Sequence, residues 1–212
     1  MEIIFENVSL SFPDKTIFSS LNINLSPGKI IQVVGENGSG KSTFLNLAAH
    51  LIRPTSGKVM AFCGKKELNG EAYRKKIAML SPNMQLYDNL TAKENLKFFS
   101  KLRGESLDCN EIAKLWERVG LREENVRHKY AGKLSTGMSQ RVKFAVFLAA
   151  KADVWILDEP SANLDDKGRS MIIKETKKAT QNGALALWAT NDERERNAAD
   201  EIIDLSNIDR VS

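Results

Sequence analysis

The sequence has few of the residues that build disulfide frameworks or metal clusters. Only two of its 212 residues are cysteine, Cys63 and Cys109, without C-x-x-C spacing, and only two are histidine, His50 and His128. This usage is typical of a protein with reduced thiols, which we expect to be buried or half-buried. The sequence predicts neither a disulfide scaffold nor a cluster of metal-binding histidines.

Long apolar runs are also missing. The longest one, at 144–150, is far shorter than the roughly 18 residues that a membrane-spanning helix needs. The first residues lack the basic and then apolar layout of a signal peptide. We therefore expect a cytoplasmic protein without a membrane span of its own.

The chain has no long block of one charge. It carries 31 Lys and Arg against 27 Asp and Glu, a formal net charge of +4 that is spread along its length. This mild excess does not by itself indicate nucleic acid, and it equally fits an anionic small ligand or a membrane-surface partner. With 42% hydrophobic and 27% charged residues, the composition is that of an ordinary globular protein. The length fits one domain, or a core with an inserted subdomain.

Strand-like and helix-like segments alternate along the chain. Apolar residues at 112, 115, 116 and 119 recur at helical spacing, within a helix-rich stretch over 91–151. Further helices are expected at 42–51, where Pro54 and Gly57 would stop the helix, and at 139–150. The pattern predicts an α/β fold with a mainly parallel sheet, into which the helical stretch is inserted. Expected strands lie at 3–10, 21–25, 29–34, 59–62, 77–80, 154–157, 184–189 and 202–205.

A glycine-rich loop follows the expected strand at 29–34. Residues 35–42 read Gly-Glu-Asn-Gly-Ser-Gly-Lys-Ser and match the G-x-x-x-x-G-K-[ST] pattern at every fixed position. Glycines let backbone N–H groups close around phosphates, Lys41 adds positive charge, and the Ser42 hydroxyl can bind Mg²⁺. The loop predicts nucleotide binding but alone leaves an ATPase, a GTPase and a small-molecule kinase open. The candidate contacts are Gly35, Asn37, Gly38, Ser39, Gly40, Lys41, Ser42 and Thr43.

Two acids end the apolar strand expected at 154–157. Asp158 and Glu159 would emerge at the carboxyl edge of the sheet, where α/β proteins bind ligands. Asp158 is a candidate Mg²⁺ ligand, and Glu159 a candidate base for the water that attacks a γ-phosphate. The alternative is that Asp-Glu-Pro merely ends a strand, but the pairing with a phosphate loop favours the catalytic interpretation.

Further segments resemble motifs of the ATP-binding cassette (ABC) family. Residues 134–141, Leu-Ser-Thr-Gly-Met-Ser-Gln-Arg, are similar to the family signature Leu-Ser-Gly-Gly-Gln, which other P-loop enzymes lack. Residues 159–165 resemble the D-loop, Gln85 matches the Q-loop, and Phe12 lies where the family places an aromatic residue on adenine. The motifs span nearly the whole chain in the expected order. The chain thus resembles the ATPase subunits of ABC transporters, and its size also resembles minimal export cassettes such as the haem-exporter ATPase of cytochrome c maturation.

The resemblance implies a P-loop NTPase core with a mainly parallel sheet, an N-terminal antiparallel β portion and an inserted α-helical subdomain. It implies a single ATPase domain over 1–212, with the core at about 1–84 and 152–212 and the helical subdomain at about 85–151. It also implies a head-to-tail dimer, which one chain type can form alone. ATP and Mg²⁺ would bind between the phosphate loop of one copy and Ser135, Gly137 and Asp165 of the other. Gln85 would sense the γ-phosphate and share the Mg²⁺.

The implied partner is a separate polytopic permease, contacted by the helical subdomain around 85–102. The chain would then lie peripherally on the cytoplasmic face of the membrane and energise transport through ATP-driven dimer closure. No nucleic acid is expected. Two alternatives stay open: a non-transport cassette acting on ribosomes or DNA, and a cassette that acts mainly by ATP-dependent dimerisation with slow turnover.

The chain departs from the family pattern at three positions. Thr136 and Met138 replace a glycine and a glutamine of the signature, and Asn191 stands where the family carries a switch histidine. Asn191 can donate a hydrogen bond to a γ-phosphate but cannot take up a positive charge. We therefore expect hydrolysis to survive through Glu159 and to be slowed. Simpler roles stay open elsewhere: a helix N-cap for Ser135, a core residue for Phe12, and a surface loop residue for Gln85.

Overall fold

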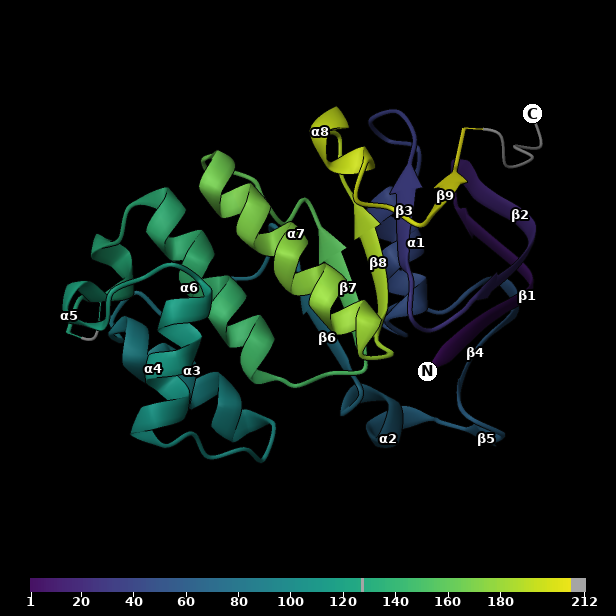
Figure 1. Ribbon diagram of the computed structural model, residues 1–212. Helices are drawn as coiled ribbons and strands as arrows, with labels where there is room; N and C mark the ends of the chain where they lie inside the picture. The colour runs from purple at the N-terminus through teal and green to yellow at the C-terminus, as the bar shows by residue number, and fades with distance from the viewer. Residues whose placement is uncertain (127, 207–212) are drawn as a thin grey trace. The chain divides into compact units, whose positions relative to one another are not determined.

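The computed structural model describes residues 1–126 and 128–206 (Figure 1). The chain divides into two compact units. The first, which we call the sheet unit, contains Met1–Met79, Asp153–Asp158 and the residues from Thr176 onward. The second, which we call the helical unit, contains Leu80–Ala152 and Glu159–Glu175. The prediction of a single ATPase domain with its insertion at 85–151 is a separate claim and stays a prediction.

The sheet unit begins with an antiparallel sheet in the order β2-β1-β4-β5. Its long pair is β1 (Glu2–Phe12) and β2 (Lys15–Leu25), and β1 also pairs with β4 (Ser56–Cys63). The short β5 (Lys66–Glu67) completes the edge. This sheet confirms the predicted N-terminal antiparallel portion.

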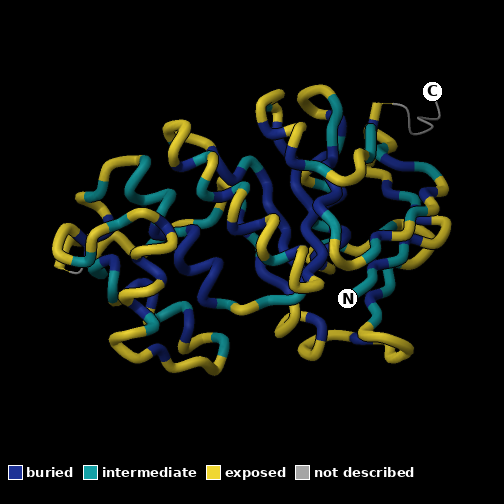
Figure 2. Tube along the Cα trace, viewed as in Figure 1, coloured by how far each residue is buried: buried dark blue, intermediate teal, exposed yellow. Residues whose placement is uncertain are grey.

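A second sheet has five strands in the order β6-β7-β8-β3-β9. Strands β7, β8, β3 and β9 pair in parallel, as predicted. Strands β3, β7 and β8 are buried over nearly their whole length, as Figure 2 shows. This pattern is typical of parallel strands that are covered on both faces. The bounds of the five strands are β3 (Ile30–Val34), β6 (Ile77–Leu80), β7 (Val154–Asp158), β8 (Leu185–Ala189) and β9 (Glu201–Asp204).

Helix α1 (Lys41–Ala48) packs on the antiparallel sheet through Phe44. The Phe44 ring stacks on Phe5 at 4.8 Å between ring centroids and meets Phe18 edge-on at 6.3 Å. The helix ends before the predicted residue 51, because His50 adopts a left-handed φ of 54° ahead of the expected stop signals. The unit also contains α2 (Gly70–Arg74) and α8 (Glu193–Arg196).

The helical unit contains α3 (Ala92–Leu102), α4 (Cys109–Arg118), α5 (Glu123–Val126) and α6 (Thr136–Ala149). A 3₁₀ turn at Ala131–Lys133 leads into α6. Helices α3 and α4 each begin with a capping box, Thr91 with Glu94 and Asp108 with Glu111. Each box satisfies N–H groups that a helix start leaves unbonded. The last helix of this part, α7 (Asp166–Gln181), runs from the helical unit into the sheet unit.

The structure places the two cysteines at the ends of secondary-structure elements. Cys63 and Cys109 are free and exposed, so the expectation of buried or half-buried thiols is wrong. Cys63 is the last residue of β4 and Cys109 the first residue of α4, and such element ends lie at the surface. Among the described residues, no helix has the length and apolar character required to cross a membrane.

Candidate nucleotide-binding site

Three neighbouring parallel strands bring the candidate residues of the sheet unit to one edge. The order β7-β8-β3 places Asp158, the segment after Ala189 and the phosphate loop at adjacent strand ends. Ligands of open α/β sheets bind at this carboxyl edge. Burial of the apolar strands therefore fixes where the polar residues emerge.

The phosphate loop needs its glycines for two physical reasons. Gly35, Gly38 and Gly40 have φ values of 149°, 79° and 103°, a region that residues with a Cβ rarely adopt. A Cβ on Gly35 would lie 2.5 Å from Ser39 Oγ, and one on Gly40 would lie 2.8 Å from Ile17 Cγ2. A Cβ on Gly38 would meet no atom within 4 Å, so glycine is needed at this position only for its backbone conformation.

Hydrogen bonding and burial orient the side chains of the loop in a way that suits an anion. The Lys41 ammonium donates to the carbonyl oxygens of Gly35 at 2.8 Å and Glu36 at 3.1 Å. Ser39 is 4% exposed, and its buried hydroxyl has no hydrogen-bond partner among residues 1–126 and 128–206. Gly40 caps α1 without a side-chain hydrogen bond, which leaves the first N–H groups of the helix for a ligand. Ser42 and Thr43 lie in that first turn, exposed and half-buried respectively.

The two acids lie in different environments. Asp158 is the last residue of β7 and only 7% exposed. Glu159 is half-buried and has a left-handed φ of 48°, which turns the chain sharply after the strand. Left-handed residues other than glycine carry a conformational cost, and such strain concentrates at functional sites.

Asn191 contacts the phosphate loop directly. Its amide Nδ2 donates to Asn37 Oδ1 at 3.2 Å, across 154 positions of sequence. The segment is fixed on both sides of Asn191, because the Asp192 N–H donates to Thr190 Oγ1 at 3.0 Å and Arg194 bonds Asp192. The sequence placed both asparagines in one site but did not predict that they pair.

The two remaining candidates outside the signature region lie at the surface. Phe12, the last residue of β1, is 53% exposed, which excludes the alternative of a core residue. Gln85 is exposed in the loop after β6. Both placements are compatible with ligand contact, and the roles of both residues stay predictions.

In the helical unit, the signature segment forms the start of α6. Ser135 is the N-cap, and its hydroxyl accepts from the Met138 N–H at 3.3 Å. This confirms the simpler role predicted for Ser135, that of a helix N-cap. A Cβ on Gly137 would lie 3.3 Å from the Asn163 carbonyl oxygen. Gly137 therefore allows the first turn of α6 to approach the D-loop segment closely.

Two side chains of α6 bind the same D-loop segment. Gln140 Nε2 donates to the Pro160 carbonyl at 2.7 Å, and Arg141 Nη2 donates to Asp165 Oδ1 at 2.9 Å. Asp165 Oδ1 also accepts from the Gly168 N–H at 2.9 Å. The Gly168 N–H and the Arg141 charge hold the pKa of Asp165 below its usual range.

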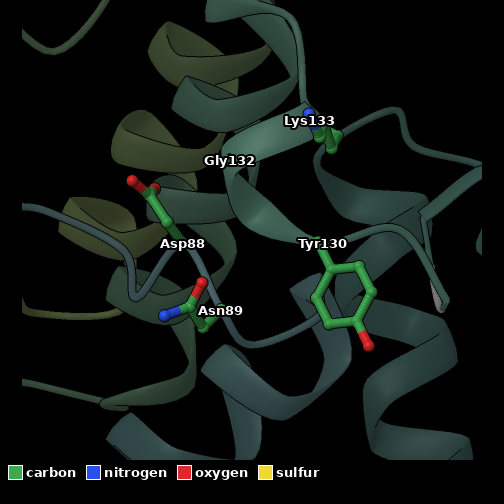
Figure 3. A pocket seen from close by; sticks show the side chains of 5 residues that line it. All are labelled: Asp88, Asn89, Tyr130, Gly132 and Lys133. Atoms are coloured by element: carbon green, nitrogen blue, oxygen red, sulfur yellow. The ribbon is translucent and has the colours of Figure 1, made fainter.

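A pocket of about 550 Å³ lies between the loop after Gln85 and the loop before the signature (Figure 3). The two loops pair through backbone hydrogen bonds from Ala131 to Leu90 at 2.9 Å and from Gly132 to Asp88 at 3.3 Å. Tyr130 at its rim and the nearby Tyr87 are 56% and 52% exposed. The lining residues are Asp88, Asn89, Tyr130, Gly132 and Lys133.

The family follows from the match of residues 18–162, most of the chain, to the family model described as ABC transporter. The chain belongs to the ABC transporter family. It is 32% identical over 197 residues to the ergothioneine transport ATP-binding protein of Helicobacter pylori, covering 91% of each chain. It is 32% identical to the Fe(3+) ions import ATP-binding protein of Brucella melitensis, covering 95% of this chain but only 57% of that protein.

The fold of this ABC cassette also matches solved structures. A dimeric bacterial ABC transporter cassette aligns with a TM-score of 0.83 at 25% identity, covering 95% of this chain and 93% of the other. The comparisons confirm the predicted family, the α/β cassette fold, ATP binding and the ATPase class. The narrower resemblance to a haem exporter and the role of each site residue stay predictions.

Proposed function

We propose that this chain binds Mg²⁺ and ATP and hydrolyses ATP to energise transport through a separate membrane-spanning partner. The observation that carries the proposal is the phosphate loop. Its glycines adopt backbone conformations that residues with a Cβ rarely take, and its Ser39 hydroxyl is buried without a hydrogen-bond partner among the described residues. Such a loop at the carboxyl edge of a parallel sheet fits a chain of phosphates. The proposed phosphate contacts are Gly35, Asn37, Gly38, Ser39, Gly40, Lys41, Ser42 and Thr43.

The proposed metal ligands are Ser42, Asp158 and Gln85. Hydroxyl, carboxylate and amide oxygens are the hard donors that Mg²⁺ prefers, and Asp158 supplies a negative charge at a buried position. Bound Mg²⁺ neutralises charge on the phosphates during the reaction. Glu159 takes the proton of the attacking water, while Gln85 and Asn191 contact the γ-phosphate.

The proposed assembly is a head-to-tail dimer of single-domain cassettes, each with its core at about 1–84 and 152–212 and its helical subdomain at about 85–151. Phe12 stacks on the adenine, and the second copy supplies Ser135, Gly137 and Asp165. Ser135 caps the Met138 N–H at the start of α6, and the proposed anion site consists of the Ser135 hydroxyl with the other N–H groups of this first turn. Because neither half-site encloses the nucleotide alone, ATP favours the closed dimer.

The proposed docking surface for the permease is the pocket of Figure 3 with the exposed Tyr87 and Tyr130. Exposed aromatic residues beside a charged rim are typical of protein interfaces. A chain bound there to a membrane protein lies peripherally on the cytoplasmic face of the membrane. Nucleic acid is not a proposed partner.

A Lys41→Ala variant tests the proposed ATP site. We expect Mg²⁺-dependent phosphate release to fall by about 100-fold or more, since a fixed charge on the phosphates is lost. Lys66→Ala, at an exposed position in β5, is the matched control and should keep wild-type turnover. Equal turnover of Lys41→Ala and wild type would contradict the proposed site.

Co-purification tests the transport role. The tagged chain is recovered from detergent-solubilised cells, and its partners are identified by mass spectrometry. We expect to recover a polytopic membrane protein in stoichiometric amount. The recovered amount should fall with Tyr130→Ala and stay unchanged with Lys66→Ala. A ribosomal or DNA-repair partner with no membrane protein would overturn the transport role and leave the ATPase chemistry intact.

Slow turnover with ATP-dependent dimerisation is a second candidate function, favoured by one observation. Asn191 replaces an ionisable side chain with a neutral amide, and this amide bonds Asn37 in the phosphate loop. A stable ATP-bound dimer with little phosphate release would support this candidate.

A further inference from the structure

We propose that Arg141 is a positioning residue that fixes the D-loop segment 159–165 to the signature helix α6. The signature and the D-loop segment, which are together proposed to contact the ATP bound by a second copy, then move as one body. This inference rests on the proposed function, because it assigns a use to the surface that Ser135, Gly137 and Asp165 present to a second cassette.

The Arg141 guanidinium joins three elements of the helical unit. Nη1 donates to the Val119 carbonyl, just after α4, at 2.8 Å, and Nη2 donates to Asp165 Oδ1, just before α7, at 2.9 Å. The Arg141 side chain is only 16% exposed, against 64% for Asp165. The guanidinium is therefore shielded and fixed in direction, while the carboxylate that it holds stays accessible to a ligand or partner.

Two glycines make room for this guanidinium. A Cβ on Gly120 would lie 2.8 Å from Arg141 Nη1. A Cβ on Gly168 would lie 3.1 Å from Arg141 Nη2, and also 2.9 Å from Leu164 Cβ and 3.0 Å from Asp165 Oδ1. Gly168 lies in the first turn of α7, where alanine would be the better helix former. Glycine at a helical position where it costs stability indicates that close approach is needed there, both of Leu164 and of the Arg141–Asp165 pair.

Besides the contact with Asp165, two further contacts join α6 to the D-loop segment. Gly137 lies against the Asn163 carbonyl, and Gln140 donates to the Pro160 carbonyl at 2.7 Å. Gly137, Gln140 and Arg141 thus contact the segment near its middle, start and end. The segment contains a left-handed residue, Asn163 with φ 65°, so it depends on such contacts to keep one conformation.

Lysine cannot replace arginine in this role. The guanidinium sends two N–H groups in fixed directions to two acceptors, whereas a lysine ammonium is a single centre on a flexible stem. A lysine at 141 keeps the positive charge beside Asp165 but loses the simultaneous bond to Val119. The conservative variant therefore separates geometry from charge.

The test compares Arg141→Lys and Arg141→Ala with Arg118→Ala in the purified chain. Arg118 is the matched control, because its guanidinium pairs with Glu175 on α7 in the same unit. We expect both Arg141 variants to lower kcat by about ten- to a hundredfold with the KM for ATP within twofold. Arg118→Ala should keep the wild-type kcat although it destabilises the fold at least as much.

A double-mutant cycle sharpens the result. Arg141→Lys combined with Asp165→Asn should be no slower than the slower single variant, because both changes break the same contact. Fully additive losses would overturn the proposal. A wild-type kcat in Arg141→Ala, or an equal loss in Arg118→Ala, would overturn it as well.

Hydrogen exchange without nucleotide supplies a readout that does not depend on turnover. The amide of Gly168, bonded to Asp165, should exchange faster in Arg141→Lys than in wild type or Arg118→Ala. Unchanged exchange would contradict the proposal. If wild type itself hydrolyses no ATP, the proposed function fails while this measurement still decides whether Arg141 holds the segment.

Discussion

The sheet unit and the helical unit hold their candidate residues by different means. In the sheet unit, the buried strands β3, β7 and β8 fix the phosphate loop, Asp158 and Asn191 through apolar burial and backbone pairing. In the helical unit, hydrogen bonds from Gln140 and Arg141 fix the D-loop segment to the signature helix. Apolar burial is non-directional and strong, whereas polar contacts are directional and weaker. The comparison indicates a rigid phosphate-loop site and a more adjustable surface at the start of α6, where a second cassette is proposed to bind.

The largest expected effect comes from a change at Glu159, the proposed base. Glu159→Gln keeps size and hydrogen bonding but cannot take a proton, so kcat should fall by about 10²- to 10⁴-fold with ATP affinity retained. Single-turnover phosphate release and nucleotide titration measure the two quantities. Turnover within threefold of wild type would show that another residue supplies the base.

Next in size is the effect of a cavity in β7, an inner strand of the parallel sheet. Ile156→Ala, at a fully buried position, should lower the free energy of unfolding by about 2–5 kcal/mol in a denaturant titration. Ile202→Ala in β9, where the side chain is 57% exposed, is the matched control with a much smaller loss. Similar losses at both positions would contradict the claim that burial in the central strands fixes this unit.

Removal of a helix cap in the helical unit should lower the free energy of unfolding by less than Ile156→Ala does. Asp108→Ala removes the side chain that accepts from the Glu111 N–H at 2.8 Å at the start of α4. Loss of such a cap lowers the free energy of unfolding by about 1 kcal/mol. Glu105→Ala, in the exposed loop before α4, serves as the control in the same titration. A loss at Asp108 as large as that of Ile156→Ala would remove the contrast between the units.

A smaller effect is expected at the departure from the family pattern. Asn191→His restores an ionisable side chain beside Asn37, and we expect steady-state ATP turnover to rise several-fold, by less than the tenfold that roughly 1.4 kcal/mol represents. Equal rates of the variant and the native protein would show that this position does not limit the chemistry.

The smallest effect is a pH dependence in the helical unit. The pKa of Asp165 is lowered in the folded chain, so its contribution to stability is complete above the ordinary Asp pKa and is lost as the pH falls through the folded value. Asp165→Asn should therefore be less stable than wild type at neutral pH, and the difference should shrink in acid. Thermal unfolding across the acidic range measures this, and a pH-independent difference would exclude the carboxylate as its source.

Sequence patterns within short segments were sufficient to predict the phosphate loop and the buried parallel strands. Glycine spacing predicted the phosphate loop, and apolar runs predicted the parallel strands that precede Gly35 and Glu159. The helix after the loop ends early because His50 adopts a left-handed conformation that no stop signal announces. The exposed cysteines were missed because their residue type favours burial while their positions at element ends do not.

Long-range polar pairs could not be predicted in the same way. Asn191 bonds Asn37 across 154 positions, and Arg141 bonds Asp165 across 24. Arg141 lies within the signature segment 134–141, but its partners depend on how α4, α6 and α7 meet, which local patterns do not predict. Glycine at position 168, within a helix, is a signal in the sequence that some close contact occurs there.

The most direct test of the central claim is the oligomeric state of Glu159→Gln with and without ATP, measured by light scattering after size-exclusion chromatography. The phosphate loop of one copy and the signature of another are proposed to enclose ATP together. The account predicts a monomer without nucleotide, a dimer with ATP, and a monomer with ATP when Lys41→Ala is added. A Glu159→Gln chain that binds ATP to saturation and stays monomeric would contradict it.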